Sequence, residues 1–345
     1  MYRAFPDVAY KQLLLFFGLK QKILVIRFSS IGDIVLTSPV LRQLKEQVIG
    51  VEIHYLTKQK YRCLLEANPY IDKIYSFEKN LNEVIPLLKA ENYGSVIDLH
   101  HNLRSLKIKR SLGVPSFSFR KLNFEKWLLV NFKIDKLPNL HIVERYLETI
   151  KSFGTKDDRK GLDYFIPETE KFDIQQLPEH FRNGYVAIIL AGTYFTKQLP
   201  AEKYLPLISN AHYNFVLLGG ENETGMARSI TSVAGNNVVD FCGKLSVNQS
   251  ASLVQQARLV ISNDTGLMHI AAAFRKKILS VWGNTVPQLG MHPYLPAEGS
   301  KMLEVNGLKC RPCSKLGKRE CPRKHFNCMN LIPEQALTDW VKINF

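Results

Sequence analysis

The sequence predicts an α/β fold built from two doubly wound, Rossmann-like domains. Apolar runs of strand length alternate with segments of helical period, and this alternation occurs twice along the chain. The expected strands are continuous apolar runs, as is typical of parallel strands that helices cover on both faces. At 345 residues, the chain is also longer than one hydrophobic core usually serves. We therefore expect two domains, each with a parallel sheet.

The first domain is expected at residues 22–158, after an N-terminal extension at 1–21. In the extension, residues 10–19 have the pattern of a short amphipathic helix. The first strand is the apolar run at 22–27, and apolar residues then repeat at helical spacing. Pro39 lies within this repeat, so it must sit in the first turns of a helix, kink the helix or mark its start. Further strands are expected at 51–55, 71–77 and 95–99, and further helices at 61–66, 81–90 and 141–153.

A polar connector at residues 154–161, bounded by glycines, separates this series from a second one. The second domain is expected at residues 159–345. Its strands are expected at 185–190, 215–218, 238–241 and 278–282, and its helices at 201–211, 224–233 and 248–257. Because the carboxyl ends of parallel strands form the ligand-binding edge of such a sheet, the turns that follow strands are the first places to look for chemistry.

Composition is that of an ordinary globular protein, because 46% hydrophobic and 22% charged residues fit neither a disordered nor a membrane-spanning chain. The apolar run at residues 13–17 is too short for a membrane span and lacks a secretory cleavage site, so we expect a cytoplasmic chain. The formal net charge of +15 predicts an acidic partner. Charge alone leaves nucleic acid, anionic lipid and a phosphorylated glycan open.

Residues 259–273 predict a strand, a tight polar turn and the start of a helix. The first amides of a helix have no internal partners and lie at the positive end of its dipole. The amides of Thr265 and Gly266 are therefore suited to bind a phosphate. His269 lies one turn further along, on the same side as Asp264. The competing interpretation is that the polar residues of the turn only cap the helix.

A second turn of this kind follows the first strand, where Phe-Ser-Ser-Ile-Gly-Asp occupies residues 28–33. A sugar hydroxyl that attacks an anomeric carbon must lose a proton, and the carboxylate of Asp33 can accept it. The start of a helix stabilises the ionised form of such a carboxylate. Position alone favours a helix cap as the role of Asp33.

Both turns resemble the hallmarks of one family. Ser-Asn-Asp-Thr-Gly-Leu-Met-His-Ile-Ala-Ala-Ala at 262–273, followed by Val-Trp-Gly-Asn-Thr at 281–285, is similar to the nucleotide-sugar site of the heptosyltransferases of glycosyltransferase family 9. The resemblance covers residues 22–332. It implies a GT-B architecture, in which two doubly wound domains face a central cleft. It also implies an inverting, metal-independent enzyme, without a cofactor, that moves heptose from ADP-heptose to the lipopolysaccharide inner core at the cytosolic face of the inner membrane.

The resemblance assigns roles to single residues. Asp33 is the base, and Lys197 and Thr193 belong to a loop that approaches the donor diphosphate. In that loop Leu190-Ala191 and Leu199 stand where the family often has His-Pro and Trp. Glu223, favoured slightly over Glu221, contacts the nucleoside, with a helix cap as the alternative role. The implied donor-binding residues are Thr193, Lys197, Glu223, Asp264, Thr265, Gly266 and His269.

Basic residues of the first domain predict the acceptor site. Arg104 and Lys107 share a helical face, so their two cations can converge on one anionic group. The resemblance supports this site, because family enzymes meet a phosphorylated, carboxylate-bearing acceptor with basic residues here, and Arg120 is a further candidate. Lys109 and Arg110 are expected on a solvated face. The expected partners are the nucleotide sugar, an anionic glycolipid and the surface of the inner membrane, without specific nucleic acid.

Four cysteines cluster near the end of the chain, with two, seven and six residues between them. A cytosolic set that begins with Cys-x-x-Cys suggests structural zinc, because four thiolates form a closed tetrahedral site. A structural cluster of thiols or an oxidation-prone disulfide are the alternatives. The four residues are Cys310, Cys313, Cys321 and Cys328. Cys63 and Cys242 are isolated and expected to be buried.

Two other functions compete with heptosyl transfer. The fold and site are compatible with another sugar nucleotide, used for surface glycan synthesis. Alternatively, the charge and the cysteines fit a zinc-containing nucleic-acid-binding protein. That second alternative leaves both strand–turn–helix hallmarks unexplained.

Overall fold

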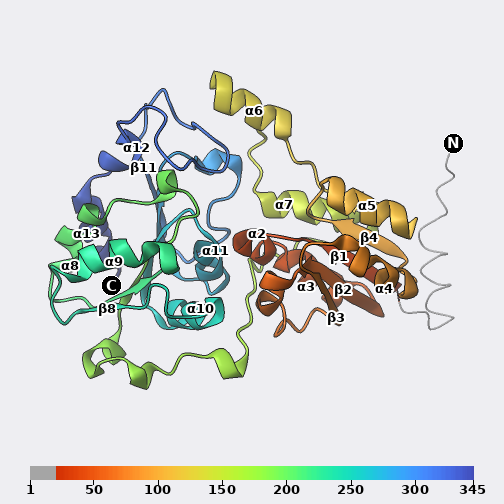
Figure 1. Cartoon of the computed structure of the whole chain (residues 1–345), viewed down its shortest axis with the longest axis horizontal. Coiled ribbons are helices and arrows are strands. Elements are labelled where there is room, and N and C mark those ends of the chain that lie inside the picture. Colours follow the sequence, from red (N-terminus) through yellow and green to blue (C-terminus); the bar gives the residue numbers. More distant parts are fainter. Residues whose placement is uncertain (1–20) are drawn as a thin grey trace. The chain divides into compact units, whose positions relative to one another are not determined.

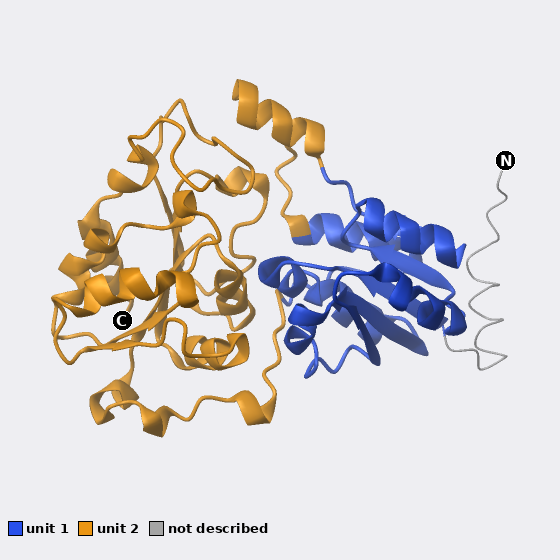
Figure 2. Ribbon diagram, viewed as in Figure 1, with its two compact units in different colours: residues 1–121, 143–160 blue, residues 122–142, 161–345 orange. Residues whose placement is uncertain are grey.

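A computed structural model describes residues 21–345 (Figure 1). The expected N-terminal extension and its helix at 10–19 therefore lie outside the described residues, apart from Gln21. The chain divides into two compact units (Figure 2). Of the described residues, 21–121 and 143–160 form the first unit, and 122–142 and 161–345 form the second. Among residues 21–345, no helix is long and apolar enough to cross a membrane.

The first unit contains a parallel sheet with the strand order β3-β2-β1-β4-β5. The strands are β1 (Gln21–Ile26), β2 (Val51–Lys58), β3 (Lys73–Phe77), β4 (Ser95–Asp98) and β5 (Ser116–Ser118). The α-helices are α2 (Ile31–Val35), α3 (Ser38–Gln47), α4 (Ile85–Ala90), α5 (Leu103–Leu112) and α7 (Ile142–Leu147), which begins one residue before the unit resumes. Leu24 and Ile26 of β1 pack with Leu56 and Val96 in a fully buried core, which explains the continuous apolar runs.

The helical repeat after β1 forms two helices, because Pro39 is the second residue of α3. At that position its missing N–H costs no hydrogen bond, whereas inside a longer helix it would. Other expected helices are partly of the tighter 3₁₀ type. These segments are Gln59–Leu64, Leu81–Glu83 and Glu148–Phe153.

An ion-pair network joins the amino-terminal ends of the first three strands. The carboxylate of Glu91 accepts hydrogen bonds from Lys22 (2.7 Å) and Lys73 (2.6 Å), and also from the hydroxyl of Tyr75. His54, which is buried in β2, lies 3.9 Å from the same carboxylate. Hydrogen bonds from the two lysines hold the pKa of Glu91 well below its usual range. The network therefore favours the ionised carboxylate at neutral pH.

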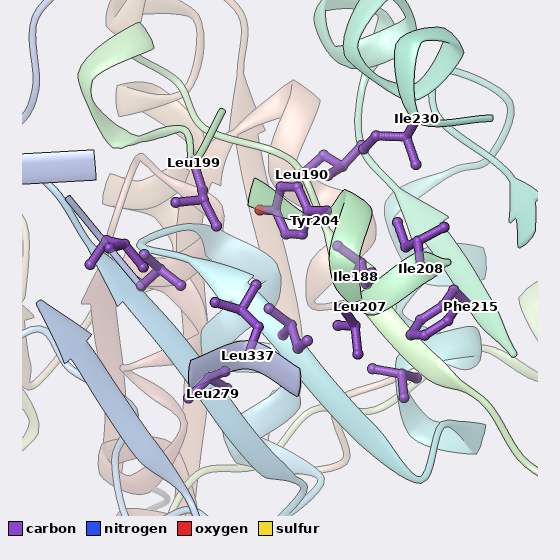
Figure 3. Close-up of a cluster of buried hydrophobic side chains, with 14 of the residues drawn as sticks. Ile188, Leu190, Leu199, Tyr204, Leu207, Ile208, Phe215, Ile230, Leu279 and Leu337 are labelled. Atoms are coloured by element: carbon purple, nitrogen blue, oxygen red, sulfur yellow. The ribbon is translucent and has the colours of Figure 1, made fainter. Parts of the chain in front are cut away.

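The second unit contains a parallel sheet with the order β11-β10-β9-β6-β7-β8. Its strands are β6 (Val186–Ile189), β7 (Phe215–Leu218), β8 (Val238–Asp240), β9 (Leu259–Asn263), β10 (Lys277–Trp282) and β11 (Lys301–Glu304). Its helices are α6 (Asn123–Phe132), α8 (Leu205–Ile208), α9 (Thr224–Thr231), α10 (Val247–Gln256), α11 (Gly266–Ala273), α12 (Asn327–Asn330) and α13 (Glu334–Asn344). Strand side chains such as Ile188 and Leu279 pack against Leu207 of α8 and Leu337 of α13 (Figure 3).

Specific contacts explain where the two units divide. Arg42 of α3 makes a bidentate ion pair with Asp158, at 2.8 and 2.9 Å, which ties the polar connector to the first unit. Residues 122–142, which we placed in the first domain from the sequence, group instead with the second unit. There Leu129 of α6 packs against Val286 and Leu289. The amide of Ile142 also donates to the carbonyl of Gly290 (2.9 Å).

The predicted fold class is confirmed, because both units are doubly wound parallel sheets. Most expected strands lie within a few residues of those observed.

Candidate functional site

Each sheet has a point where the direction of winding reverses. In the second unit β6 leads outward to β7 and β8, and β9 then returns to the other side of β6. In the first unit the corresponding neighbours are β1 and β4. Loops that leave the carboxyl ends of two such strands run apart and leave a crevice, which is where open α/β sheets bind ligands. Both sequence hallmarks follow one of these four strands.

In the second unit the loops after β6 and β9 meet through charged side chains. The ammonium group of Lys197 lies 2.6 Å from the carboxylate of Asp264. The hydroxyl of Thr285, from the loop after β10, donates to the same carboxylate (2.9 Å). Lys197 and Asp264 are both partly exposed. The structure therefore presents a lysine, fixed by a carboxylate, at the switch point of the sheet.

The amino-terminal end of α11 lies directly beside this pair in the sequence. Thr265 is the N-cap residue, with extended backbone angles, and its side chain makes no capping hydrogen bond. Thr265 and Gly266 are partly exposed. The free amides at the helix start and the positive end of its dipole suit a phosphate. His269 is buried, with 3% of its surface exposed, so its surroundings are protein atoms.

Hydrogen bonds between side chains and backbone hold the Lys197 loop in place. Asn263, the last residue of β9, accepts from the amide of Leu199 (3.2 Å) and donates to the carbonyl of Leu190 (3.0 Å). The hydroxyl of Thr196 accepts from the amide of Lys318 (2.8 Å). The segment that carries the cysteines thus supports the loop that carries Lys197.

Glu223 and Thr193 differ in their surroundings. The carboxylate of Glu223 accepts from the amide of Gly220 (2.8 Å) and from the side chain of Gln198 (2.9 Å), and the residue is buried. These contacts fit the capping role that was the alternative for this residue. Thr193 is exposed on the loop after β6. Glu221 is exposed as well.

In the first unit Asp33 lies in the first turn of α2, directly after β1. Its carboxylate accepts hydrogen bonds from the amide (3.1 Å) and the hydroxyl (2.8 Å) of Ser30. The guanidinium of Arg27 lies 2.6 Å from the second carboxylate oxygen. Arg27 itself is held by the carbonyl of Leu99 (2.5 Å) and the hydroxyl of Tyr146 (2.9 Å). Asp33 is therefore fixed in position and remains partly exposed.

Two opposing effects set the pKa of Asp33. Burial raises it, but the charge of Arg27 and the hydrogen bonds from Ser30 together outweigh burial and lower the pKa below its usual value of 3.8. The ion pair with Asp33 likewise raises the pKa of Arg27. Asp33 is consequently ionised at neutral pH, as a proton acceptor must be.

The predicted acceptor residues lie on and after α5. Arg104 and Arg120 are exposed. Lys107 donates to the side chain of Asn82 (2.7 Å) and lines a shallow surface pocket of about 320 Å³, together with Arg110. Lys107 and Arg110 of α5 thus both line this pocket.

The expectation of a solvated face is wrong for Lys109. Its ammonium group lies 3.0 Å from the fully buried carboxylate of Asp98, at the end of β4. Asp98 also accepts hydrogen bonds from the amide of His101 (2.6 Å) and the hydroxyl of Ser105 (2.8 Å). A buried carboxylate needs such partners, and this demand draws Lys109 inward.

The four clustered cysteines are free thiols in one segment of the second unit. Burial raises the pKa of Cys313, and it raises that of Cys328 to about 12. Neighbouring thiols of the same segment raise both values further. The sulfur of Cys310 also lies 4.0 Å from the imidazole of His325. Five soft or borderline metal-ligand side chains thus gather in residues 310–328.

Within residues 21–345, the one group of three or more histidine, cysteine or acidic side chains whose ligand atoms all lie within 4.8 Å of one another is Glu52, His54 and Glu91. Lys22 and Lys73 already neutralise Glu91 there, so this set belongs to the ion-pair network of the first sheet. The cysteine sulfurs are more widely spaced than this set.

Sequence reasoning did not identify several supporting residues. Arg27 looked like the end of an apolar strand, and Asp98 like part of one. A charge near the carboxyl end of a buried apolar run was the available signal for both, because such a charge requires a partner. Gln198, which bridges Glu223 and the carbonyl of Gly192 (3.0 Å), carried no such signal.

Comparisons with known proteins identify a family, similar sequences and similar structures. Residues 83–325 match the family model "Glycosyltransferase family 9 (heptosyltransferase)". Lipopolysaccharide heptosyltransferase 1 of Campylobacter coli is 25% identical over 288 residues, which cover 76% of this chain and 84% of that protein. A glycosyltransferase family 9 structure from Veillonella parvula superposes with a TM-score of 0.76 at 21% identity, covering 94% of this chain and 97% of that one. The structure of E. coli heptosyltransferase WaaC with ADP gives a TM-score of 0.67 at 19% identity, covering 94% and 100%.

Proposed function

Because the chain belongs to glycosyltransferase family 9, and is thus a glycosyltransferase, we propose that it transfers heptose from ADP-heptose to the lipopolysaccharide inner core. The names of similar proteins support this donor and acceptor, since they include lipopolysaccharide heptosyltransferases and a structure with ADP. The observation that carries the proposal is the Lys197–Asp264 pair beside the start of α11, at the switch point of the second sheet. This arrangement fits a nucleoside diphosphate.

Asp33 is the proposed general base. Its ionised carboxylate takes the proton from the acceptor hydroxyl as that oxygen attacks the anomeric carbon of the heptose. The bond between this carbon and the diphosphate oxygen breaks on the opposite face, so the configuration inverts. Arg27 positions the carboxylate and keeps it ionised.

The departing ADP gains negative charge, which the second unit is proposed to stabilise. Lys197 and the amides of Thr265 and Gly266 provide positive charge and hydrogen bonds where that charge develops. Asp264 holds Lys197, and Thr285 holds Asp264. The protein itself supplies these charges, so we propose that transfer is independent of a divalent metal. Thr193, Glu223 and His269 remain proposed donor-site residues.

The proposed acceptor is an anionic glycolipid of the inner membrane, reached from the cytosolic face. Arg104, Lys107 and Arg120 are its proposed contacts, and Arg110 joins Lys107 at the pocket on α5. Specific nucleic-acid binding is not part of the proposal. Salt-sensitive binding to random DNA, with an affinity comparable to that for ADP, would contradict this part.

Calorimetric titration with ADP, UDP and GDP, in the presence of a chelator, tests the donor. We expect ADP to bind best, and Lys197→Ala to weaken binding by about tenfold or more, because a charged hydrogen bond to phosphate is lost. Lys244→Ala is the matched control, since Lys244 is an exposed lysine of the same unit that pairs with Asp240.

Two other outcomes of this titration have distinct meanings. A preference for UDP or GDP keeps the site but favours another sugar nucleotide. Absence of nucleotide binding contradicts the assignment of the site. If the titration shows that ADP binds, the next experiment is a transfer assay of Asp33→Asn. This substitution is expected to slow heptosyl transfer by about 10²–10⁴-fold, while leaving the affinity for ADP unchanged.

For the cysteines, the finer proposal is a structural zinc site formed by Cys310, Cys313, Cys321 and Cys328. Four thiols within one short segment, each able to act as thiolate ligand, support it. The same segment supports the Lys197 loop through Lys318. Metal analysis of purified protein is expected to give about one zinc per chain, and a fully reactive set of thiols in native protein would contradict the site.

A further inference from the structure

Helix α6, which is labelled in Figure 1, carries three exposed aromatic side chains. Phe124, Trp127 and Phe132 are 66%, 50% and 58% exposed. The rings of Phe124 and Trp127 stack with centroids 6.0 Å apart, and those of Trp127 and Phe132 meet edge to face at 5.1 Å. The three rings therefore form one continuous patch, which we call the aromatic face. Large apolar patches of this kind usually mark an interaction site in a soluble protein.

The other side of α6 is attached to the second unit. Leu129 is buried against Val286 and Leu289. Just beyond the helix, Lys133 donates to the carbonyl of Pro312 (2.7 Å). These contacts fix which side of α6 is covered, so the aromatic face is the side left exposed.

Basic residues flank α6 along the chain. Residues 120–136 contain five lysines or arginines and two acidic residues, Glu125 and Asp135. Arg120 and Lys121 precede the helix, and Lys133 and Lys136 follow it. Aromatic rings flanked by cations are the composition that proteins use at a membrane surface, where the rings enter the headgroup region and the cations meet lipid phosphates.

We propose that α6 docks the enzyme on an anionic bilayer, with the aromatic face inserted among the lipid headgroups. The inference rests on the proposed function, because a glycolipid acceptor is held in such a bilayer. A second copy of the chain fits this face poorly. Each copy carries a formal net charge of +15, so pairing two faces flanked by lysines would bring like charges together.

Tryptophan fluorescence with lipid vesicles tests the proposal. The chain has three tryptophans, and Trp282 and Trp340 are already buried, at 0% and 4% exposed. Trp127 is thus the one whose emission responds to docking. With vesicles containing phosphatidylglycerol we expect a blue shift and protection from acrylamide, both absent in Trp127→Ser. With phosphatidylcholine alone, or at high salt, binding is expected to weaken by about tenfold or more.

The double variant Phe124→Ser/Phe132→Ser keeps the reporter Trp127 and removes two inserting rings. We expect at least about tenfold weaker vesicle binding, while circular dichroism stays unchanged. Ile343→Ser is the matched control, because Ile343 is an apolar residue of the same unit that is 81% exposed on α13. It is expected to bind vesicles like the parent protein.

Two results would overturn the proposal. One is vesicle binding by the double variant equal to that of the parent. The other is a concentration-dependent dimer in sedimentation velocity that the double variant abolishes, which would assign the face to a second copy. The proposed function is tested separately, by transfer to a delipidated acceptor without vesicles. In this assay the double variant should transfer heptose at the same rate as the parent. If neither protein transfers heptose while the parent still binds vesicles, the proposed function is rejected and the docking proposal stands.

Discussion

Arg27 is the residue that sets the behaviour of the proposed base. It contacts one oxygen of Asp33, while Ser30 occupies the other. The sequence indicates Asp33 through its position after a strand and a glycine turn. It does not indicate Arg27, whose role depends on the carbonyl of Leu99 and the hydroxyl of Tyr146, which are distant in the chain.

Replacing Arg27 by Met is expected to raise the pKa of Asp33, because the charge that lowers it is lost while burial remains. The acid limb of the pH profile of kcat/KM should therefore move to higher pH, since Asp33 must be ionised to act. His100 interacts electrostatically with both residues, and burial lowers its pKa to about 4. The profile is therefore also measured in a His100→Gln background, in which titration of His100 cannot contribute to the acid limb.

Tyr146→Phe is the control for this change. It removes one hydrogen bond to Arg27 (2.9 Å) and leaves the Arg27–Asp33 ion pair in place. Its acid limb should stay near that of the parent. An unchanged limb in Arg27→Met would mean that Asp33 is not the group seen in the profile.

At the scale of elements, the loop after β10 packs against the loop that carries Lys197. Gly283 follows β10, and a Cβ atom there would lie 2.6 Å from Met329 and 2.7 Å from the carbonyl oxygen of Thr196. Thr196 directly precedes Lys197. The close packing therefore links the helix α12, the end of β10 and the residue that is proposed to bind diphosphate.

Gly283→Ala is expected to lower the free energy of unfolding by about 1–3 kcal/mol, because backbone must move to admit the methyl group. It should also weaken ADP binding, since the Lys197 loop moves with Thr196. Urea unfolding and calorimetry measure the two effects. Gly225→Ala is the control, because nothing lies within 4 Å of its Cβ position in α9. A Gly283→Ala protein with parental stability and affinity would show that the contact is easily relieved.

Strands were easier to predict from the sequence than helices, for a physical reason. A buried parallel strand needs a continuous apolar run, and β1, β6 and β7 all show one. Helix α6 was missed because its apolar residues lie on both its buried and its exposed sides, so no single stripe appears. The environment of Lys109 was not predictable in this way, because helical spacing on α5 does not reveal that its side chain turns inward to the buried Asp98.

Within residues 21–345, each unit has a large hydrophobic core of its own. All three tryptophans lie in the second unit, where the proposed donor site is found. Tryptophan fluorescence therefore reports unfolding of that unit. This allows a ligand effect to be assigned to one half of the chain.

ADP at 100 times its Kd is expected to stabilise the second unit by about 2.7 kcal/mol, through preferential binding to the folded state. The thermal transition detected by tryptophan should rise by roughly 5–10 °C for a unit of this size. Lys197→Ala should reduce the shift, and Asp33→Asn should keep it. Loss of the shift in Asp33→Asn alone would place the nucleotide in the first unit.

The ion-pair network around Glu91 has a consequence for how the first unit can change. It joins the strands at their amino ends, whereas Asp33 and α5 follow the carboxyl ends of β1 and β4. This network therefore stabilises the sheet at the end opposite to the one where the acceptor is proposed to bind. Substitutions near the carboxyl ends of the strands can therefore change which acceptor is preferred, while the ion pairs at the amino ends continue to stabilise the sheet.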